Sequence, residues 1–320
     1  MRVLVTGGAG FIGSHLVDAL VARGDEVVVL DDLSSGTREN LATVADRVRL
    51  IAGSVTDRDA LAAATDGCAL VFHQAAIASV PRTIEAPVET NAVNFGGTLN
   101  VLEAARAAGS RRVIFAGSAA IYGDDAPLPV GEDAPLSPLS PYAIEKLCAE
   151  HYVRVWAPLF GLETVSLRYF NVFGPRQDPR SPYSGVVSIF VDSLLRGEAP
   201  TIYGDGEQTR DFVAVDDVVR ANLAAAAVSA PVGLVCNIAR GEATSLNRLF
   251  ATLSSLLGGP AAPRHAEARP GDVRHSLADV TRARVALGFV ASTTVEVGLA
   301  RLVEWARSVR GRAGADPGSA

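Results

Sequence analysis

Residues 3–13 of the chain read Val-Leu-Val-Thr-Gly-Gly-Ala-Gly-Phe-Ile-Gly. A short β-branched strand runs directly into a glycine-rich turn, and a helical pattern begins at once. Gly7, Gly10 and Gly13 form a GxxGxxG spacing. Small residues here let the backbone approach a pyrophosphate, and the unpaired N–H groups at the start of a helix attract its charge. The stretch predicts a dinucleotide-binding strand, turn and helix; the alternative is a tight turn that binds nothing.

The rest of the first half repeats the alternation of strand and helix. After VLVT come the apolar runs EVVVL, VRLIA, ALVFH and RVIFAGS, with amphipathic segments between them. This alternation predicts an α/β fold with a Rossmann-type, doubly wound parallel sheet and helices on both faces. Beyond Leu167 the pattern loosens, with Pro, Gly and Ser-rich loops at 175–185 and 258–271. We expect that part to form a smaller, interleaved α/β substrate-binding lobe.

These patterns set the expected domain boundaries. The dinucleotide-binding domain is predicted at residues 1–168 plus about 212–236, and the substrate lobe at about 169–211 plus 237–309. Residues 310–320 have no apolar anchors and are predicted to be a disordered tail. Residues 221–239 are rich in Ala and Val but are interrupted by polar and turn residues, which predicts a helix, a turn and a buried strand in place of a membrane span.

Composition narrows the class of protein. With 48% hydrophobic and 20% charged residues, the 320-residue chain is expected to fold around a sizeable core. A net charge of −6 argues against a nucleic-acid binder, because phosphate-backbone affinity rests on clustered Lys and Arg. Cys68, Cys148 and Cys236 have neither zinc-ligand nor disulfide-framework spacing, so we expect no metal and a reducing, cytoplasmic location.

An acidic pair ends the second apolar run. EVVVL is followed by Asp31 and Asp32, about where an acidic side chain meets the ribose hydroxyls of a dinucleotide. A carboxylate there repels a 2′-phosphate, so the position favours NAD over NADP. The alternative is an acid that serves only to solvate the strand end.

Two later segments carry catalytic side chains. Ser118 ends RVIFAGS, and Tyr142 and Lys146 lie four residues apart on one face of the next predicted helix. An ammonium beside the phenol, with a positive nicotinamide ring nearby, is expected to lower the tyrosine pKa so that it acts as a base. Ser118 is expected to hold or relay a substrate hydroxyl proton.

The lysine has a second argument in its favour. Of the 29 Lys and Arg residues, Lys146 alone is lysine. A lysine that served only as a surface charge could have been replaced by arginine here as elsewhere. The ammonium is a compact charge whose pKa can shift, whereas a guanidinium is wide and stays protonated. We therefore interpret Lys146 as catalytic; the alternative is a surface lysine left by chance.

Together the motifs resemble a known family. VTGGAGFIGSHL, His73-Gln74-Ala75-Ala76, NFGGTLNVLEAA, Ser118 with IYGD, SPYAIEK, RYFNVFGPRQDP, GDGEQTRDFV and RPGDVRHSLAD are similar to the extended short-chain dehydrogenases, and within them to the UDP-glucose and UDP-N-acetylglucosamine 4-epimerases. The resemblance covers nearly the whole chain. It implies an NAD-dependent enzyme that inverts C4 of a UDP-sugar through a transient 4-keto intermediate. It also implies a homodimer, formed through the helices around residues 94–108 and 142–157.

The resemblance assigns further residues. The cofactor-binding residues it implies are Gly7, Gly10, Phe11, Ile12, Gly13, Asp31, Asp32, Ser54, Val55, Gln74, Ala75, Ala76, Asn94, Tyr142 and Lys146. Asn94 resembles an asparagine that supports the region of the catalytic lysine. The substrate-binding residues are Arg82, Ser118, Asn171, Gln177, Arg210, Arg269, Asp272 and Ser276, with Arg210 and Arg269 as a diphosphate clamp. Asn171 can instead cap a loop, and either clamp arginine can pair with an acidic neighbour.

Departures from the family pattern leave the sugar open. Relatives that dehydrate or decarboxylate the 4-keto sugar carry an acid where this chain has Ala119 and Ala120, which favours simple epimerisation. The same two alanines lack the hydroxyls of many N-acetylhexosamine-preferring relatives, yet the small Ser276 leaves room for larger sugars. Arg82 or Arg180 can meet a uronate carboxylate or remain a solvated surface residue.

Ser54 stands where an aspartate commonly contacts adenine, which puts that contact in doubt. The alternative functions are a 4-keto sugar reductase or nucleotide-sugar dehydrogenase with the same three residues and, from another class, a non-catalytic NAD-binding scaffold.

Overall fold

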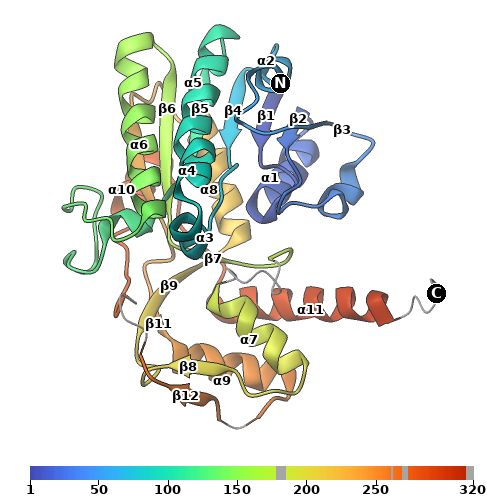
Figure 1. The fold of residues 1–320 in the computed structure, drawn as a ribbon, viewed down its shortest axis with the longest axis vertical. Helices are drawn as coiled ribbons and strands as arrows, with labels where there is room; N and C mark the ends of the chain where they lie inside the picture. Colours follow the sequence, from blue (N-terminus) through green and yellow to red (C-terminus); the bar gives the residue numbers. More distant parts are fainter. Residues whose placement is uncertain (178–184, 261, 269–272, 315–320) are drawn as a thin grey trace.

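The computed structural model describes residues 1–177, 185–260, 262–268 and 273–314. A smaller lobe lies at one end of the strands of a large parallel sheet, and Figure 1 shows the two stacked vertically.

The large sheet has seven strands that all run parallel. They are β1 (Arg2–Thr6), β2 (Glu26–Asp31), β3 (Val48–Ala52), β4 (Leu70–His73), β5 (Arg112–Ser118), β6 (Glu163–Tyr169) and β10 (Leu234–Ile238), in the order β10-β6-β5-β4-β1-β2-β3. The chain therefore builds outward from β1 to β3, then returns to the other side of β1 with β4. This reversal of strand order creates the crevice where open α/β sheets bind their ligands. The predicted Rossmann-type sheet is confirmed.

Helices cover both faces of this sheet. The first layer comprises α1 (Phe11–Ala22), α8 (Val215–Ala227) and α10 (Thr281–Leu287), and the second comprises α2 (Arg58–Thr65), α5 (Gly97–Ala107) and α6 (Pro141–Phe160). In Figure 1, α5 and α6 lie in front of the sheet and α8 behind it. Strands β1, β2 and β4 are buried on both faces, which is why they read as continuous apolar runs, whereas the edge strand β3 is only partly buried.

Short helical segments connect these layers. They are a 3₁₀ segment at Arg38–Val44, α3 (Val80–Glu85), α4 (Pro87–Asn91), a π-helical turn at Ala92–Gly96 and a 3₁₀ turn at Ala119–Tyr122. The π-helical turn leads directly into α5.

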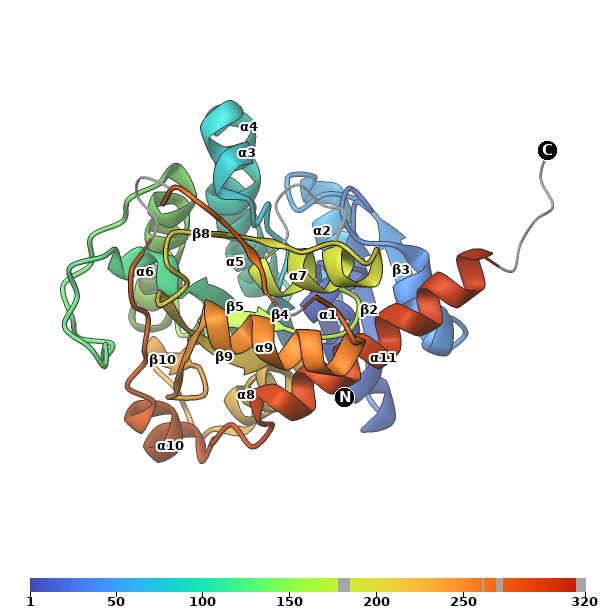
Figure 2. The same cartoon turned by 90° about the horizontal axis from the view of Figure 1, so that it is seen from below.

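In the part of the chain that the structure describes, the smaller lobe is built from two small sheets and three helices. The first sheet is β7 (Asn171–Phe173), β9 (Thr209–Ala214) and β11 (Ala243–Ser245), and the second pairs β8 (Thr201–Tyr203) with β12 (Arg264–Ala266). Helices α7 (Val186–Leu195), α9 (Leu246–Leu257) and α11 (Val295–Gly314) pack with them around Phe173, Phe190, Phe212 and Leu249. Figure 2, viewed from below, shows this lobe lying across the end of the large sheet.

The structure differs from the expected boundaries in three places. Helix α10 packs on α8 and β10, so 281–287 cover the large sheet and not the lobe. Residues 212–214 continue β9 in the small sheet. Helix α11 runs to Gly314, so 310–314 are helical. A local pattern shows that a segment is amphipathic but not which sheet it covers.

Residues 221–239 contain the end of α8, a turn and β10, as predicted. Over the ranges given above, no helix has both the length and the apolar character needed to cross a membrane.

Candidate active site and cofactor cleft

The glycine-rich turn after β1 is held by close backbone packing. A Cβ on Gly13 would lie 2.0 Å from the carbonyl oxygen of Gly7, and a Cβ on Gly7 would lie 2.7 Å from the nitrogen of Ala75. Gly7 also has a φ of 68°, in the left-handed region. Only glycine lets α1 start this close to β1 and β4. The turn follows β1, the strand at which the order of the sheet reverses.

The first turn of α1 offers free donors to a ligand. Its N-cap is Gly10, and no side chain caps the helix. By contrast, Ser140 caps α6 and Ser245 caps α9 through their side-chain oxygens. The N–H groups at Phe11, Ile12 and Gly13 precede the first intrahelical bond, which Ser14 donates to Gly10. An uncapped helix start of this kind suits a pyrophosphate, so the residues present fit the predicted dinucleotide.

The acidic pair lies beside this turn. The Asp31 carboxylate accepts hydrogen bonds from the backbone nitrogens of Ala9 (2.8 Å) and Leu33 (2.9 Å), and burial raises its pKa. Asp32 is exposed, and its carboxylate accepts hydrogen bonds from the backbone nitrogen and the hydroxyl of Ser34. Asp31 thus supports the glycine turn itself, a structural role that the sequence did not reveal, while its carboxylate stays at the end of β2.

The remaining predicted cofactor residues line the neighbouring strand ends. The Gln74 side chain donates to Asn222 (3.1 Å) and accepts from the Tyr169 hydroxyl (3.1 Å), so it ties β4 to α8 and β6. The Ser54 hydroxyl accepts from Thr56. Three further positions follow: Val55 is buried against Gly97, and Ala75 and Ala76 are partly buried after β4.

Ser118, Tyr142 and Lys146 come together at the end of β5. Ser118 is the last residue of that strand, and its hydroxyl is hydrogen-bonded with the Tyr142 side chain. Lys146 lies one helical turn further along α6 and donates a 2.8 Å hydrogen bond to the carbonyl oxygen of Ala116, two residues before Ser118. The predicted catalytic residues therefore share one site, although they come from two separate elements.

The lysine is buried in an apolar environment. Its side chain is 3% exposed, and Nζ lies 4.7 Å from the centre of the Phe115 ring. Burial lowers the pKa of Lys146 to about 8, with the Glu145 charge acting in the opposite direction. A lysine in this position is no solvated surface charge, which contradicts the alternative considered for it.

The expected lowering of the tyrosine pKa depended on both the lysine and a positive nicotinamide ring, and in the chain alone the pKa of Tyr142 is raised. Burial raises the pKa of Tyr142, the Ser118 hydrogen bond lowers it, and the Glu145 charge raises it again. The Lys146 ammonium is directed to Ala116, so the loss of hydration dominates. In the chain alone, the lysine does not offset the effect of burial on the pKa of the phenol.

Asn94 lies in the π-helical turn and joins two segments near this site. Its side chain accepts from the Ile77 backbone nitrogen (2.7 Å) and donates to the Glu145 carboxylate (2.6 Å). Thr90 donates to the same carboxylate at 2.9 Å. Sequence reasoning missed Glu145 and Thr90, since a single acid inside YAIEK has no spacing that marks it as buried.

The predicted substrate residues that the structure describes lie on or near the small sheet. Asn171 begins β7 and is exposed, and β7 pairs with β9, which carries Arg210. Arg210 and Ser276 are both bonded to the carbonyl oxygen of Thr209. Gln177 lies partly buried, with its side-chain oxygen unpaired. Arg269, Asp272 and Arg180 lie outside the described residues.

Arg82 is placed differently from the other predicted substrate residues. It forms a salt bridge with Glu89 at 2.8 Å, and its side chain is 39% exposed. Its guanidinium is thus engaged at the protein surface between α3 and α4, which supports the solvated-surface alternative for this residue.

The loop after β7 is tied to the cofactor helix, a feature that no sequence pattern showed. Arg176 forms a salt bridge with Asp18 at 2.7 Å, and the His15 ring is bonded to the carbonyl oxygen of Pro175 at 2.9 Å. Because Gln177 follows directly, the structure links the predicted substrate segment to α1.

Comparison with known proteins agrees with this arrangement. Residues 3–239 match the NAD dependent epimerase/dehydratase family. The UDP-glucose 4-epimerase of Mycolicibacterium smegmatis is 41% identical over 312 residues, covering 96% of this chain and 99% of that protein. The crystal structure of UDP-glucose 4-epimerase with UDP-glucose from Thermotoga maritima has a TM-score of 0.92 at 41% identity, covering 97% of this chain and 100% of that one.

Other similar proteins carry different substrates or reactions. The UDP-N-acetylglucosamine 4-epimerase of Methanobrevibacter ruminantium, in complex with UDP-N-acetylmuramic acid, has a TM-score of 0.92 at 39% identity, covering 96% of this chain and 98% of that one. Similar proteins also include a UDP-N-acetylglucosaminuronate decarboxylase and a dTDP-glucose 4,6-dehydratase. These relatives are all enzymes that act on nucleotide-sugars. The matched family is NAD-dependent, and NAD is the cofactor that the sequence predicted. The chain belongs to the NAD-dependent epimerase/dehydratase family.

Proposed function

We propose that the protein is a UDP-sugar 4-epimerase with retained NAD and that UDP-glucose is its first candidate substrate. The observation that carries the proposal is the meeting of Ser118, Tyr142 and the buried sole lysine at the carboxyl end of β5, the same end of the parallel sheet at which the uncapped α1 follows β1. The similarity to two UDP-glucose 4-epimerases over nearly the whole chain supports the choice of reaction.

The catalytic residues have distinct roles in this proposal. Bound NAD would supply the oxidation and re-reduction of the sugar at C4, and a positive nicotinamide ring near Tyr142 would favour its phenolate form. Tyr142 accepts the proton of the C4 hydroxyl, and Ser118 holds that hydroxyl in line. Lys146 holds a positive charge near Ser118 and Tyr142 through its hydrogen bond to the carbonyl oxygen of Ala116. With the 4-keto sugar turned about its diphosphate link, hydride from the bound cofactor would reach the opposite face of C4, and Tyr142 would return the proton to the C4 oxygen.

The turn after Ser118 favours epimerisation over elimination. Ala119 and Ala120 form the first half of the 3₁₀ turn and carry no acid or base. A dehydratase or decarboxylase is expected to need a further protein side chain that transfers a proton to or from the sugar. The proposed reaction needs only Tyr142 for proton transfer, because the proton of the C4 hydroxyl leaves and returns at the same sugar oxygen.

The proposed substrate site extends from the sheet edge into the lobe. Arg210 and Arg269 clamp the diphosphate, since guanidinium groups match phosphate oxygens in pairs. Asn171, Gln177, Asp272 and Ser276 complete the nucleotide and sugar contacts. The unpaired Gln177 oxygen is a buried acceptor that a sugar hydroxyl can satisfy. Because Glu89 engages Arg82, Arg82 is not proposed as a reader of a uronate carboxylate.

The test is direct. The purified protein, with no added cofactor, is incubated separately with UDP-glucose, UDP-N-acetylglucosamine and UDP-glucuronate, and the C4 epimers are resolved by NMR. Conversion of UDP-glucose to UDP-galactose is expected. Conversion that requires added NAD⁺ would show that the cofactor is not retained, and no conversion of any sugar would contradict the proposal.

The proposed assembly is a homodimer formed through α5 and α6. The outer face of α6 exposes Ile144 (51%), Tyr152 (41%), Val155 (45%) and Leu159 (67%). Their spacing places them along one stripe of the helix, and an apolar stripe of this length in contact with water is typical of an interface. A cytoplasmic location is proposed as well, because all three cysteines are free.

A further inference from the structure

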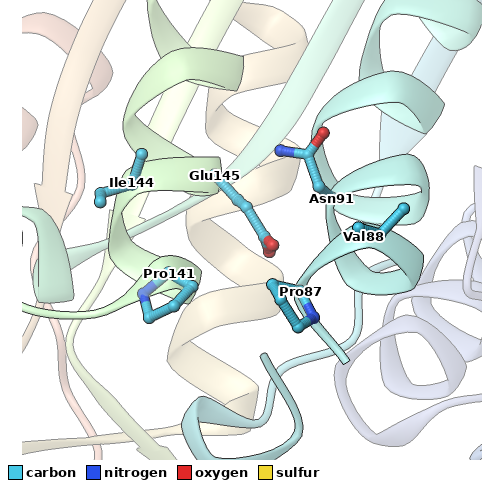
Figure 3. A pocket seen from close by; sticks show the side chains of 6 residues that line it. All are labelled: Pro87, Val88, Asn91, Pro141, Ile144 and Glu145. Carbon is cyan, nitrogen blue, oxygen red and sulfur yellow. The ribbon is translucent and has the colours of Figure 1, made fainter. Parts of the chain in front are cut away.

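A carboxylate that the proposed mechanism does not use is buried beside the catalytic helix's lysine. Glu145 is 3% exposed, and its oxygens accept from Thr90 (2.9 Å) and from the Asn94 amide (2.6 Å). Figure 3 shows the side chain extending from α6 toward α4, at a cavity of about 380 Å³ that is also lined by Pro87, Val88, Asn91, Pro141 and Ile144. Both donors are neutral, so neither cancels the charge.

This burial is costly unless the charge has a use. Taking a carboxylate out of water is unfavourable, and two neutral hydrogen bonds compensate for it only in part. The next residue, Lys146, is also 3% exposed, and among the described residues its ammonium donates a hydrogen bond only to the neutral carbonyl of Ala116. Two opposite charges thus lie next to each other in the chain, each removed from water and each held by neutral partners.

The other groups that face the lysine do not replace this carboxylate. His73 of β4 is buried between Thr6 and Thr98, and burial and the Lys146 charge lower its pKa to about 3, so it is neutral. Phe115 of β5 presents its ring face to the ammonium. Tyr142, with Ser118 beside it, is a neutral phenol in the chain alone.

We infer that Glu145 is a positioning residue for Tyr142 and Lys146. Its carboxylate, held by Thr90 and Asn94, keeps the buried Lys146 in its ammonium form. Asn94 also binds the Ile77 backbone, so the same contact fixes α6 to the segment that follows β4. The catalytic meaning of this charge rests on the proposed function, but the effect on the lysine does not.

The direction of the effect follows from the surroundings. Burial lowers the pKa of Lys146 to about 8, and the Glu145 charge is the opposing influence that raises it. The same charge raises the pKa of Tyr142. Removing the carboxylate therefore lowers both pKa values, while a merely structural residue would change neither.

The sole lysine makes this measurable without substrate. Protein labelled with ¹³Cε-lysine gives one lysine signal, and its titration reports Lys146 alone. The wild-type midpoint is expected near pH 8, and the Glu145→Gln midpoint about one pH unit lower. Glu103→Gln is the matched control, since it removes an exposed carboxylate on α5 and is expected to leave the midpoint unchanged.

Each outcome decides the matter. A lowered midpoint in Glu145→Gln with an unchanged control supports the inference, and the pH profile of turnover should move to lower pH with it. An unchanged midpoint would overturn the inference. Glu145→Met, of similar size, is the second neutral variant; if neither variant folds by circular dichroism, the carboxylate is structural and the inference is overturned. Because the titration needs no turnover, failure of the proposed function is detected separately.

Discussion

The ammonium of Lys146 donates a 2.8 Å hydrogen bond to the carbonyl oxygen of Ala116, which fixes the catalytic helix to the strand that ends in Ser118. This contact sets the spacing between the hydroxyl at the end of β5 and the phenol at the start of α6. It also explains why a lysine persists in a chain that otherwise uses arginine.

Lys146→Arg is therefore expected to be far from conservative. The wider guanidinium cannot keep both the bond to Ala116 and the contact with the Phe115 ring, so kcat should fall about 10²- to 10⁴-fold. Steady-state kinetics with UDP-glucose measures the effect. Arg106→Lys on the exposed face of α5 is the control, and a Lys146→Arg enzyme with wild-type kcat would refute the role.

Gly13→Ala should release the cofactor. The added Cβ would meet the Gly7 carbonyl at 2.0 Å, so α1 must move away from the glycine turn and its first N–H groups lose their position. The NAD that co-purifies with the protein, measured by chromatography after acid release, is expected to fall severalfold. Gly131→Ala is the matched control, because a Cβ there meets no atom within 4 Å. Equal NAD content in both variants would contradict the assigned site.

Val155→Glu should convert the proposed dimer to a monomer. Val155 lies in the exposed apolar stripe of α6, and an interface that buries it would bring two charges together across a two-fold axis. Light scattering coupled to size exclusion gives the mass. Val285→Glu, on the exposed face of α10, should leave the mass unchanged. A wild-type protein with the mass of a monomer would contradict the proposed dimer.

Glu150→Gln should strongly destabilise the fold. Glu150 and Arg168 are 0% and 1% exposed and form a bidentate pair at 2.6 and 2.8 Å, joining α6 to β6. Removing one partner leaves a buried guanidinium without its counter-charge, which costs about 3–5 kcal/mol. Urea unfolding measures the loss of unfolding free energy. The exposed Glu103→Gln is expected to cost about 1 kcal/mol or less, and similar losses for the two variants would show that the pair is not as buried as described.

Much of the fold and part of the site follow from local sequence. The glycine spacing and the apolar runs predict the sheet because each signal lies within one strand or one turn. The serine, tyrosine and lysine could be found because they stand at fixed offsets on one strand end and one helix face.

The rest depends on contacts between distant segments. The buried Glu145 could not be read from YAIEK, because its partners Thr90 and Asn94 come from another helix. The link between Arg176 and Asp18 spans 158 residues. The raised pKa of Tyr142 reflects the loss of water around its phenol, which the spacing of Tyr and Lys does not reveal.

The central claim is that hydride leaves and returns at the same sugar carbon within one enzyme molecule. UDP-glucose deuterated at C4 tests it most directly, when it is converted in ordinary water without added NAD and the product is examined by NMR. The account predicts UDP-galactose that retains the deuterium at C4. Loss of the deuterium to solvent, or no conversion of the labelled sugar, would contradict it.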